Sequence, residues 1–152
     1  MGWDEILDGD GCPANVSVQS WRAPDLYPKG KTEPVAVKAA RLGHDVVLSP
    51  MRSTYFSVPA GPDDSGEYRM PTSVYRWYIP PEAVRAFRPD TGFPEHLKGL
   101  ILGAECCCWS EGTRTGPILH QKTWPRAKIF AEGLLRSHRT CTCGPAGGTQ
   151  PR

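Results

Sequence analysis

A strand–helix–strand pattern in the first third of the chain limits the folds that this sequence can adopt. Val16–Trp21 alternates apolar and polar residues, as a half-buried strand does. The Ala-rich segment Pro34–Leu42 predicts a helix, with Pro34 near its first turn and Gly43 as its stop. The β-branched run Asp45–Ser49 predicts a second strand. Because a helix joins the two strands, we expect them to lie parallel in one sheet.

Further predicted strands and helices lie on both sides of this strand–helix–strand unit. Trp3–Leu7 is predicted to be a short strand end that enters a loop. Residues 100–109 are predicted to form another strand, after a long connection rich in Pro and Gly over residues 50–98. Pro117–Leu135 predicts a helix that Pro125 breaks or restarts. This order fits part of a (β/α) barrel or of an open α/β sheet, and four strands are too few to close a barrel.

Composition argues against several classes of function. The chain has 152 residues, with 18 basic and 16 acidic side chains and a formal net charge of +2. It therefore lacks the basic stripe that neutralises nucleic-acid phosphates. We expect no membrane partner, because no apolar run is long enough to span a bilayer. No signal peptide is visible at the start of the chain, and the compartment stays open.

The cysteines do not predict a metal site. There are six, and three of them form the run Cys106–Cys108. Zinc sites use Cys-x-x-Cys pairs with histidine partners, and Cys141-Thr142-Cys143 has a different gap. We therefore interpret the cysteines as small apolar residues on a strand and in the C-terminal tail.

Aromatic residues stand at or just beyond the ends of four predicted strands. Trp3 and Trp21 end the first two, Tyr55 follows the third, and Trp109 lies near the end of the last. Because parallel strands place their carboxyl ends at one edge of a sheet, these rings would wall a pocket there. Such a pocket fits a small, partly apolar group, such as an acetamide methyl or the face of a pyranose.

The last predicted strand carries the most chemistry. Alternation places Glu105, Cys107, Trp109 and Glu111 on one face. A tryptophan beside a carboxylate suits a sugar, because the ring covers C–H groups and the carboxylate accepts hydrogen bonds from hydroxyls. On this strand alone, a core tryptophan beside a solvated glutamate is the simpler interpretation.

Several short motifs occur in a fixed order along the chain. They are Gly2–Leu7 (Gly-Trp-Asp-Glu-Ile-Leu), Ser20–Arg22, Gly43–Pro50 followed by Thr54–Phe56, Leu102–Glu111, and Trp124–Arg126 followed by Ala131-Glu132. In this order they resemble segments of the β-N-acetylhexosaminidases of glycoside hydrolase family 20. Each motif alone is only moderately specific, but together the motifs span residues 2–135.

The resemblance implies a fold and a domain organisation. The chain would be α/β, a partial (β/α)8 TIM barrel made of strands five to eight, with a long loop after strand seven and a C-terminal helix. Residues 1–136 would form the C-terminal half of a glycoside hydrolase catalytic barrel. Residues 137–152 are expected to be a disordered tail, because Thr, Cys, Gly and Pro replace the periodic pattern there.

The resemblance also implies the roles of individual residues. Trp3, Trp21 and Trp109 would wall the pocket around the acetamide of the substrate. Tyr55 would donate its hydroxyl to the acetamide carbonyl, and Glu111 would bind distal sugar hydroxyls. The implied reaction is the retaining, substrate-assisted removal of a terminal N-acetylhexosamine, in which the acetamide oxygen attacks the anomeric carbon. The partners would be glycans that contain N-acetylglucosamine or N-acetylgalactosamine, and no cofactor is implied.

The sequence departs from the family pattern in two important places. The general acid of the family lies in a His-x-Gly-Gly-Asp-Glu segment, which does not occur in these 152 residues. Asp4-Glu5 belongs to a different motif, and we expect it to have a structural role. Ser57 stands where the family usually has Asp after the tyrosine.

These departures leave three interpretations of the chain. The first is a fragment or truncated relative of a β-N-acetylhexosaminidase that has little or no turnover by itself. The second is a non-catalytic carbohydrate-binding or interaction module. The third is a half-barrel that pairs with the missing half or with a second chain.

Overall fold

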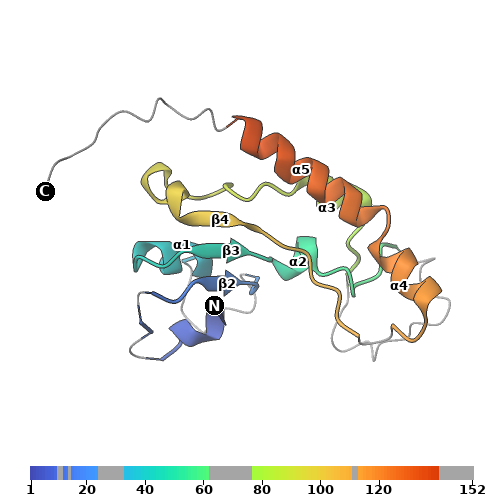
Figure 1. Ribbon diagram of the computed structural model, residues 1–152, viewed down its shortest axis with the longest axis horizontal. Helices are drawn as coiled ribbons and strands as arrows, with labels where there is room; N and C mark the ends of the chain where they lie inside the picture. The colour runs from blue at the N-terminus through green and yellow to red at the C-terminus, as the bar shows by residue number, and fades with distance from the viewer. Residues whose placement is uncertain (10–11, 14, 24–32, 62–76, 111–112, 141–152) are drawn as a thin grey trace, which may run out of the picture.

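The protein has an α/β fold with a four-stranded parallel sheet in the order β1-β2-β3-β4 (Figure 1). The computed structural model describes residues 1–9, 12–13, 15–23, 33–61, 77–110 and 113–140. Residues 137–140 are described by their backbone only. The strands are β1 (Gly2–Trp3), β2 (Val18–Ser20), β3 (Val46–Leu48) and β4 (Ile101–Ala104). They are short, so most side chains of interest lie just beyond their ends.

Helices join and cover the strands. They are the 3-10 helices η1 (Asp4–Leu7) and η4 (Glu95–Leu100) and the α-helices α1 (Val35–Arg41), α2 (Met51–Thr54), α3 (Pro81–Ala86), α4 (Gly116–Thr123) and α5 (Arg126–Thr140). Helix α1 joins β2 to β3, as the strand–helix–strand pattern predicts. Among the described residues, no helix has both the length and the apolar character needed to cross a membrane.

Two buried clusters hold the elements together. In the first, Ala36, Ala39 and Ala40 of α1 pack against Val18, Val46 and Leu48 of the sheet. Because side chains alternate along a strand, Gln19 and Val47 face the other side of the sheet. The second cluster joins α2, α3 and α5 through residues that include Phe56, Val84 and Phe130. Figure 1 shows α3 and α5 running side by side, and the two helices are in contact.

Two predicted elements differ most from the observed ones. The strand predicted over residues 100–109 ends at Ala104. The neighbouring strand β3 ends at Leu48, and α2 begins at Met51. Beyond Ala104, the last strand therefore has no adjacent strand, in the part of the chain that the structure describes, with which to form a regular hydrogen-bond ladder. Helix α5 runs to Thr140, which extends it into the range predicted as a tail. The rest of that range, residues 141–152, lies outside the described residues.

A buried arginine links the last helix to the connection before α3. Arg126, at the start of α5, is 1% exposed. Its guanidinium donates to the carbonyl oxygens of Val58 (2.8 Å), Ile79 (3.1 Å) and Phe56 (2.8 Å). Its carbon Cζ also lies 4.7 Å from the centre of the Phe56 ring. The arginine thus satisfies three carbonyls that lie outside the helices and strands.

Replacing Arg126 by methionine is expected to destabilise the fold strongly. The change keeps an apolar stem but leaves buried carbonyls without donors, and each unsatisfied group costs about 1–3 kcal/mol. We expect the free energy of unfolding in urea to fall by at least about 3 kcal/mol. Arg136→Met, at an exposed position of the same helix, is the matched control and should change it little. Equal effects of the two substitutions would contradict this account.

Candidate functional site

The four aromatic residues singled out in the sequence lie in one continuous set of ring contacts. The centres of the Trp3 and Trp109 rings are 5.6 Å apart, and those of Trp109 and Tyr55 are 6.1 Å apart. Tyr55 stacks on Trp21 at 6.2 Å, with an angle of 18° between the ring planes. Glu111, the other predicted site residue, lies outside the described residues. We call the four rings the aromatic set.

Backbone pairing explains why residues far apart in sequence meet here. Trp3 ends β1 and pairs in register with Gln19 of β2, two residues before Trp21. Beyond the ends of β3 and β4, the chain pairs again through a parallel bridge between Tyr55 and Cys107. In this bridge, Cys107 N–H donates to the Thr54 carbonyl (2.9 Å). Tyr55 is thereby fixed near Trp109, although neither residue belongs to a strand.

The members of the aromatic set differ in how firmly they are embedded. Tyr55 is 5% exposed and belongs to the buried cluster around α2, α3 and α5. Trp21 is partly buried and packs against the same cluster. Trp109 is 39% exposed, so much of its ring is available to a ligand. The set therefore has a rigid base and an open side.

A groove opens beside Trp3 and Trp109. It has a volume of about 290 Å³ and is lined by Trp3, Gln19, Glu105, Cys107, Cys108 and Trp109. The sequence predicted that Glu105, Cys107 and Trp109 would share a face, and all three line this groove. Gln19 was not predicted, although its alternation with the buried Val18 places it on this side of β2. Sequence periodicity gave no reason to expect Cys108 there as well.

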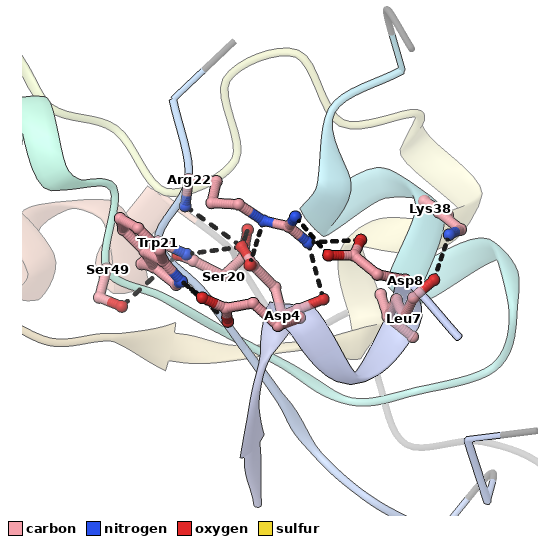
Figure 2. Close-up of polar contacts among 9 residues, drawn as sticks. Asp4, Leu7, Asp8, Ser20, Trp21, Arg22, Lys38 and Ser49 are labelled. Atoms are coloured by element: carbon pink, nitrogen blue, oxygen red, sulfur yellow. Dashed lines mark hydrogen bonds and ion pairs between the residues drawn. The ribbon is translucent and has the colours of Figure 1, made fainter. Parts of the chain in front are cut away.

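A buried carboxylate joins the ends of β1 and β2 (Figure 2). Asp4 is 0% exposed, and its Oδ2 accepts hydrogen bonds from the backbone N–H of Trp21 (2.9 Å) and of Arg22 (3.2 Å). The Nε of Arg22 donates to Oδ1 at 2.6 Å. Asp4 thus has the structural role expected for the Asp4-Glu5 pair, and it fixes the backbone that carries Trp21.

Neighbouring acidic groups complete this network. Arg22 also donates to both carboxylate oxygens of Asp8, at 2.8 and 3.0 Å. The hydrogen bond from Arg22 lowers the pKa of Asp8, so the pair adds stability at neutral pH that is lost as the pH falls through this lowered pKa. The Trp21 indole N–H donates to both carboxylate oxygens of Glu5 at 3.0 Å. Glu5 therefore sets the orientation of the ring that stacks on Tyr55.

The groove contains an unreactive thiol. Burial, and secondarily the nearby carboxylate of Glu105, raise the pKa of Cys107 to about 12. The Cys107 thiol also donates to Glu105 Oε1 at 3.7 Å, a weak hydrogen bond. Because the thiolate is the nucleophilic form, Cys107 is poorly suited to act as a nucleophile.

Asp4→Asn is expected to destabilise the protein by about 2–3 kcal/mol, because it removes the charged acceptor of the Arg22 Nε–H and leaves the more exposed Asp8 as the counter-charge of Arg22. Urea unfolding measures the change. Glu33→Gln, which removes the carboxylate from the exposed Glu33–Arg41 pair, is the control and should have little effect. A small loss for Asp4→Asn, similar to the control, would show that this network does not organise the site.

Cys107 is expected to resist alkylation. In a Cys106→Ser, Cys108→Ser background, iodoacetamide at pH 8 should label Cys107 far more slowly than free cysteine. A pKa near 12 instead of the ordinary 9.0 makes the thiolate fraction roughly a thousandfold smaller. Glu105→Gln removes a charge that raises this pKa, so it should increase the labelling rate, which mass spectrometry of the peptide can follow. Rapid labelling of Cys107 while Glu105 is still present would contradict this electrostatic description.

Sequence relatives are hexosaminidases. The chain is 29% identical over 133 residues to a beta-hexosaminidase of Porphyromonas gingivalis, covering 87% of this chain and 15% of that protein. It is 27% identical over 135 residues to a beta-hexosaminidase of Vibrio furnissii, covering 86% of this chain and 20% of that protein. The chain therefore spans a fifth or less of the length of these two relatives.

Solved structures share the fold. The GH20 beta-N-acetylhexosaminidase from Streptomyces coelicolor A3(2) matches with a TM-score of 0.70 and 22% identity, over 88% of this chain and 25% of that one. The Streptomyces plicatus N-acetyl-beta-hexosaminidase in complex with Thio-NAglucal matches with a TM-score of 0.67 and 23% identity, over 88% and 25%. The family model for the glycosyl hydrolase family 20 catalytic domain matches residues 1–136, so this chain belongs to glycosyl hydrolase family 20.

Proposed function

We propose that this chain provides the acetamide-binding side of a β-N-acetylhexosaminidase, a retaining glycosidase that removes terminal N-acetylhexosamines. The observation that carries the proposal is the contact of Trp3, Trp21, Tyr55 and Trp109 in one aromatic set. Packing alone does not require four rings from four separate segments to meet around a partly exposed tryptophan. Ring faces of this kind cover the apolar surface of a sugar and its acetamide methyl.

The proposal assigns the four strands to strands five to eight of a (β/α)8 barrel. It is supported by the parallel sheet with sequential strand order and by the likeness to family structures. In such barrels, catalytic and binding residues lie beyond the carboxyl ends of the strands. Trp3, Trp21, Tyr55 and Trp109 all lie at or beyond those ends.

Each member of the site has a chemical role in this proposal. Trp3, Trp21 and Trp109 enclose the acetamide, and Tyr55 donates its hydroxyl to the acetamide carbonyl. The buried position of Tyr55 and the Glu5 hydrogen bond to Trp21 favour a preorganised site. A fixed acetamide keeps its oxygen close to the anomeric carbon, which it attacks in the substrate-assisted reaction. Glu111 would bind hydroxyls at the far side of the sugar.

The general acid is not among these 152 residues, because they contain no His-x-Gly-Gly-Asp-Glu segment. We therefore propose that the chain by itself binds the sugar but does not turn it over. Acid–base assistance contributes typically about 10²–10⁴-fold to rate. The partner would be the other half of the barrel, or a second chain that supplies it. Within the described residues, β1 and β4 each pair with one neighbour only, so both edges of the sheet can accept a further strand.

N-acetylglucosamine is the ligand for the first test, because the structure of the Streptomyces plicatus D313N mutant contains this sugar as product. Titration into the purified chain should give a saturable change in tryptophan fluorescence, and glucose, which lacks the acetamide, should not. Trp109→Ala should raise the dissociation constant at least about tenfold, as expected for a central aromatic contact. Trp124→Ala, at a similarly exposed tryptophan outside the aromatic set, is the matched control.

Hydrolysis of a chromogenic N-acetylglucosaminide by the same preparation should stay at background. Robust turnover would overturn the proposed absence of the acid. A fluorescence signal that does not respond to N-acetylglucosamine would overturn the acetamide site itself.

A further inference from the structure

The groove extends the aromatic set on one side. Trp3 and Trp109 belong to both, so a group held against these two rings also borders the groove. The groove volume of about 290 Å³ is several times the roughly 30 Å³ that one water occupies in the liquid. The methyl end of an acetamide would leave most of this space unfilled.

The lining of the groove includes hydrogen-bonding groups that a methyl cannot use. Gln19 belongs to β2, and Glu105 follows β4 directly, so the two side chains come from different strands. The Glu105 backbone N–H donates to the Leu48 carbonyl at 2.9 Å, which fixes the position of this residue beside β3. The carboxylate accepts from the Cys107 thiol through one oxygen, and a carboxylate has capacity for several acceptor contacts.

These groups select the chemistry of an occupant. A carboxylate accepts hydrogen bonds and repels anions, which disfavours an acidic substituent. A hydroxyl can donate to Glu105 and accept from the side-chain amide of Gln19. The tryptophan rings and the two thiols make the remaining lining largely apolar, so a neutral hydroxyl can enter at a smaller desolvation cost than an ammonium.

We propose that this groove is a subsite for a hydroxylated N-acyl group, such as N-glycolyl, and that Glu105 is its specificity-determining residue. The inference rests on the proposed acetamide site and adds the substrate class to it. An N-glycolyl hexosamine differs from the N-acetyl compound by one hydroxyl on the acyl methyl. That hydroxyl would enter the groove and donate to Glu105.

The test compares three monosaccharides by tryptophan fluorescence: N-acetylglucosamine, N-glycolylglucosamine and N-propionylglucosamine. The N-propionyl compound has a similar acyl length without the hydroxyl, so it separates available space from hydrogen bonding. N-glycolylglucosamine should bind about tenfold more tightly than the other two, the usual scale of a hydrogen bond to a charged group. Glu105→Ala should abolish this preference and leave N-acetylglucosamine binding close to its original value.

Glu95→Ala, at an exposed glutamate of η4, is the control and should retain the preference. Far-UV circular dichroism checks that the variants are folded, and the comparison of ligands on the unmodified chain needs no variant. Equal or weaker binding of N-glycolylglucosamine, with N-acetylglucosamine still bound, would overturn the subsite but leave the proposed function intact. Equal tightening by N-propionylglucosamine would overturn the role of Glu105, and failure of all three to bind would overturn the acetamide site.

Discussion

The buried Asp4 carboxylate is the interaction on which the site depends most. It lies where β1 ends, and it binds the backbone and guanidinium of the residues that follow β2. A carboxylate without solvent is stable only when it is paired and hydrogen-bonded, so its geometry determines where the two strand ends lie. Trp3 and Trp21 flank this interaction in the sequence. Their relative position therefore depends on the hydrogen bonds of this buried carboxylate.

A second constraint acts on the other half of the aromatic set. The chain leaves β3 for the short helix α2 and then pairs with the segment after β4 through Tyr55 and Cys107. Although it is a single bridge and not a continuous ladder, this pairing brings Tyr55 beside Trp109. Cys107 of this bridge also lines the groove, so one backbone pairing positions both Tyr55 and part of the groove.

The sequence predicted the parts of the fold that local patterns encode. The Ala-rich helix ending near Gly43 and the β-branched strand that follows it have strong local preferences, and both are observed. The length of the last strand could not be predicted, because it depends on where its neighbour ends. The four aromatic residues could be identified from their positions after strands. The alternation of Gln19 with Val18 indicates its face of β2, but its place in the groove, like that of Cys108, depends on residues that meet only after folding.

Tyr55 belongs both to the aromatic set and to the buried cluster that contains Phe56 and Phe130. In the proposed site, a side chain shared in this way couples ligand binding to the packing of α2, α3 and α5. Any molecule that binds the folded form through Tyr55 shifts the folding equilibrium of that helical layer by mass action. Conversely, a substitution deep among the helices, far from the rings in sequence, would be felt as a change in affinity. If the proposed sugar binds through Tyr55, its affinity and the stability of this helical layer are therefore linked.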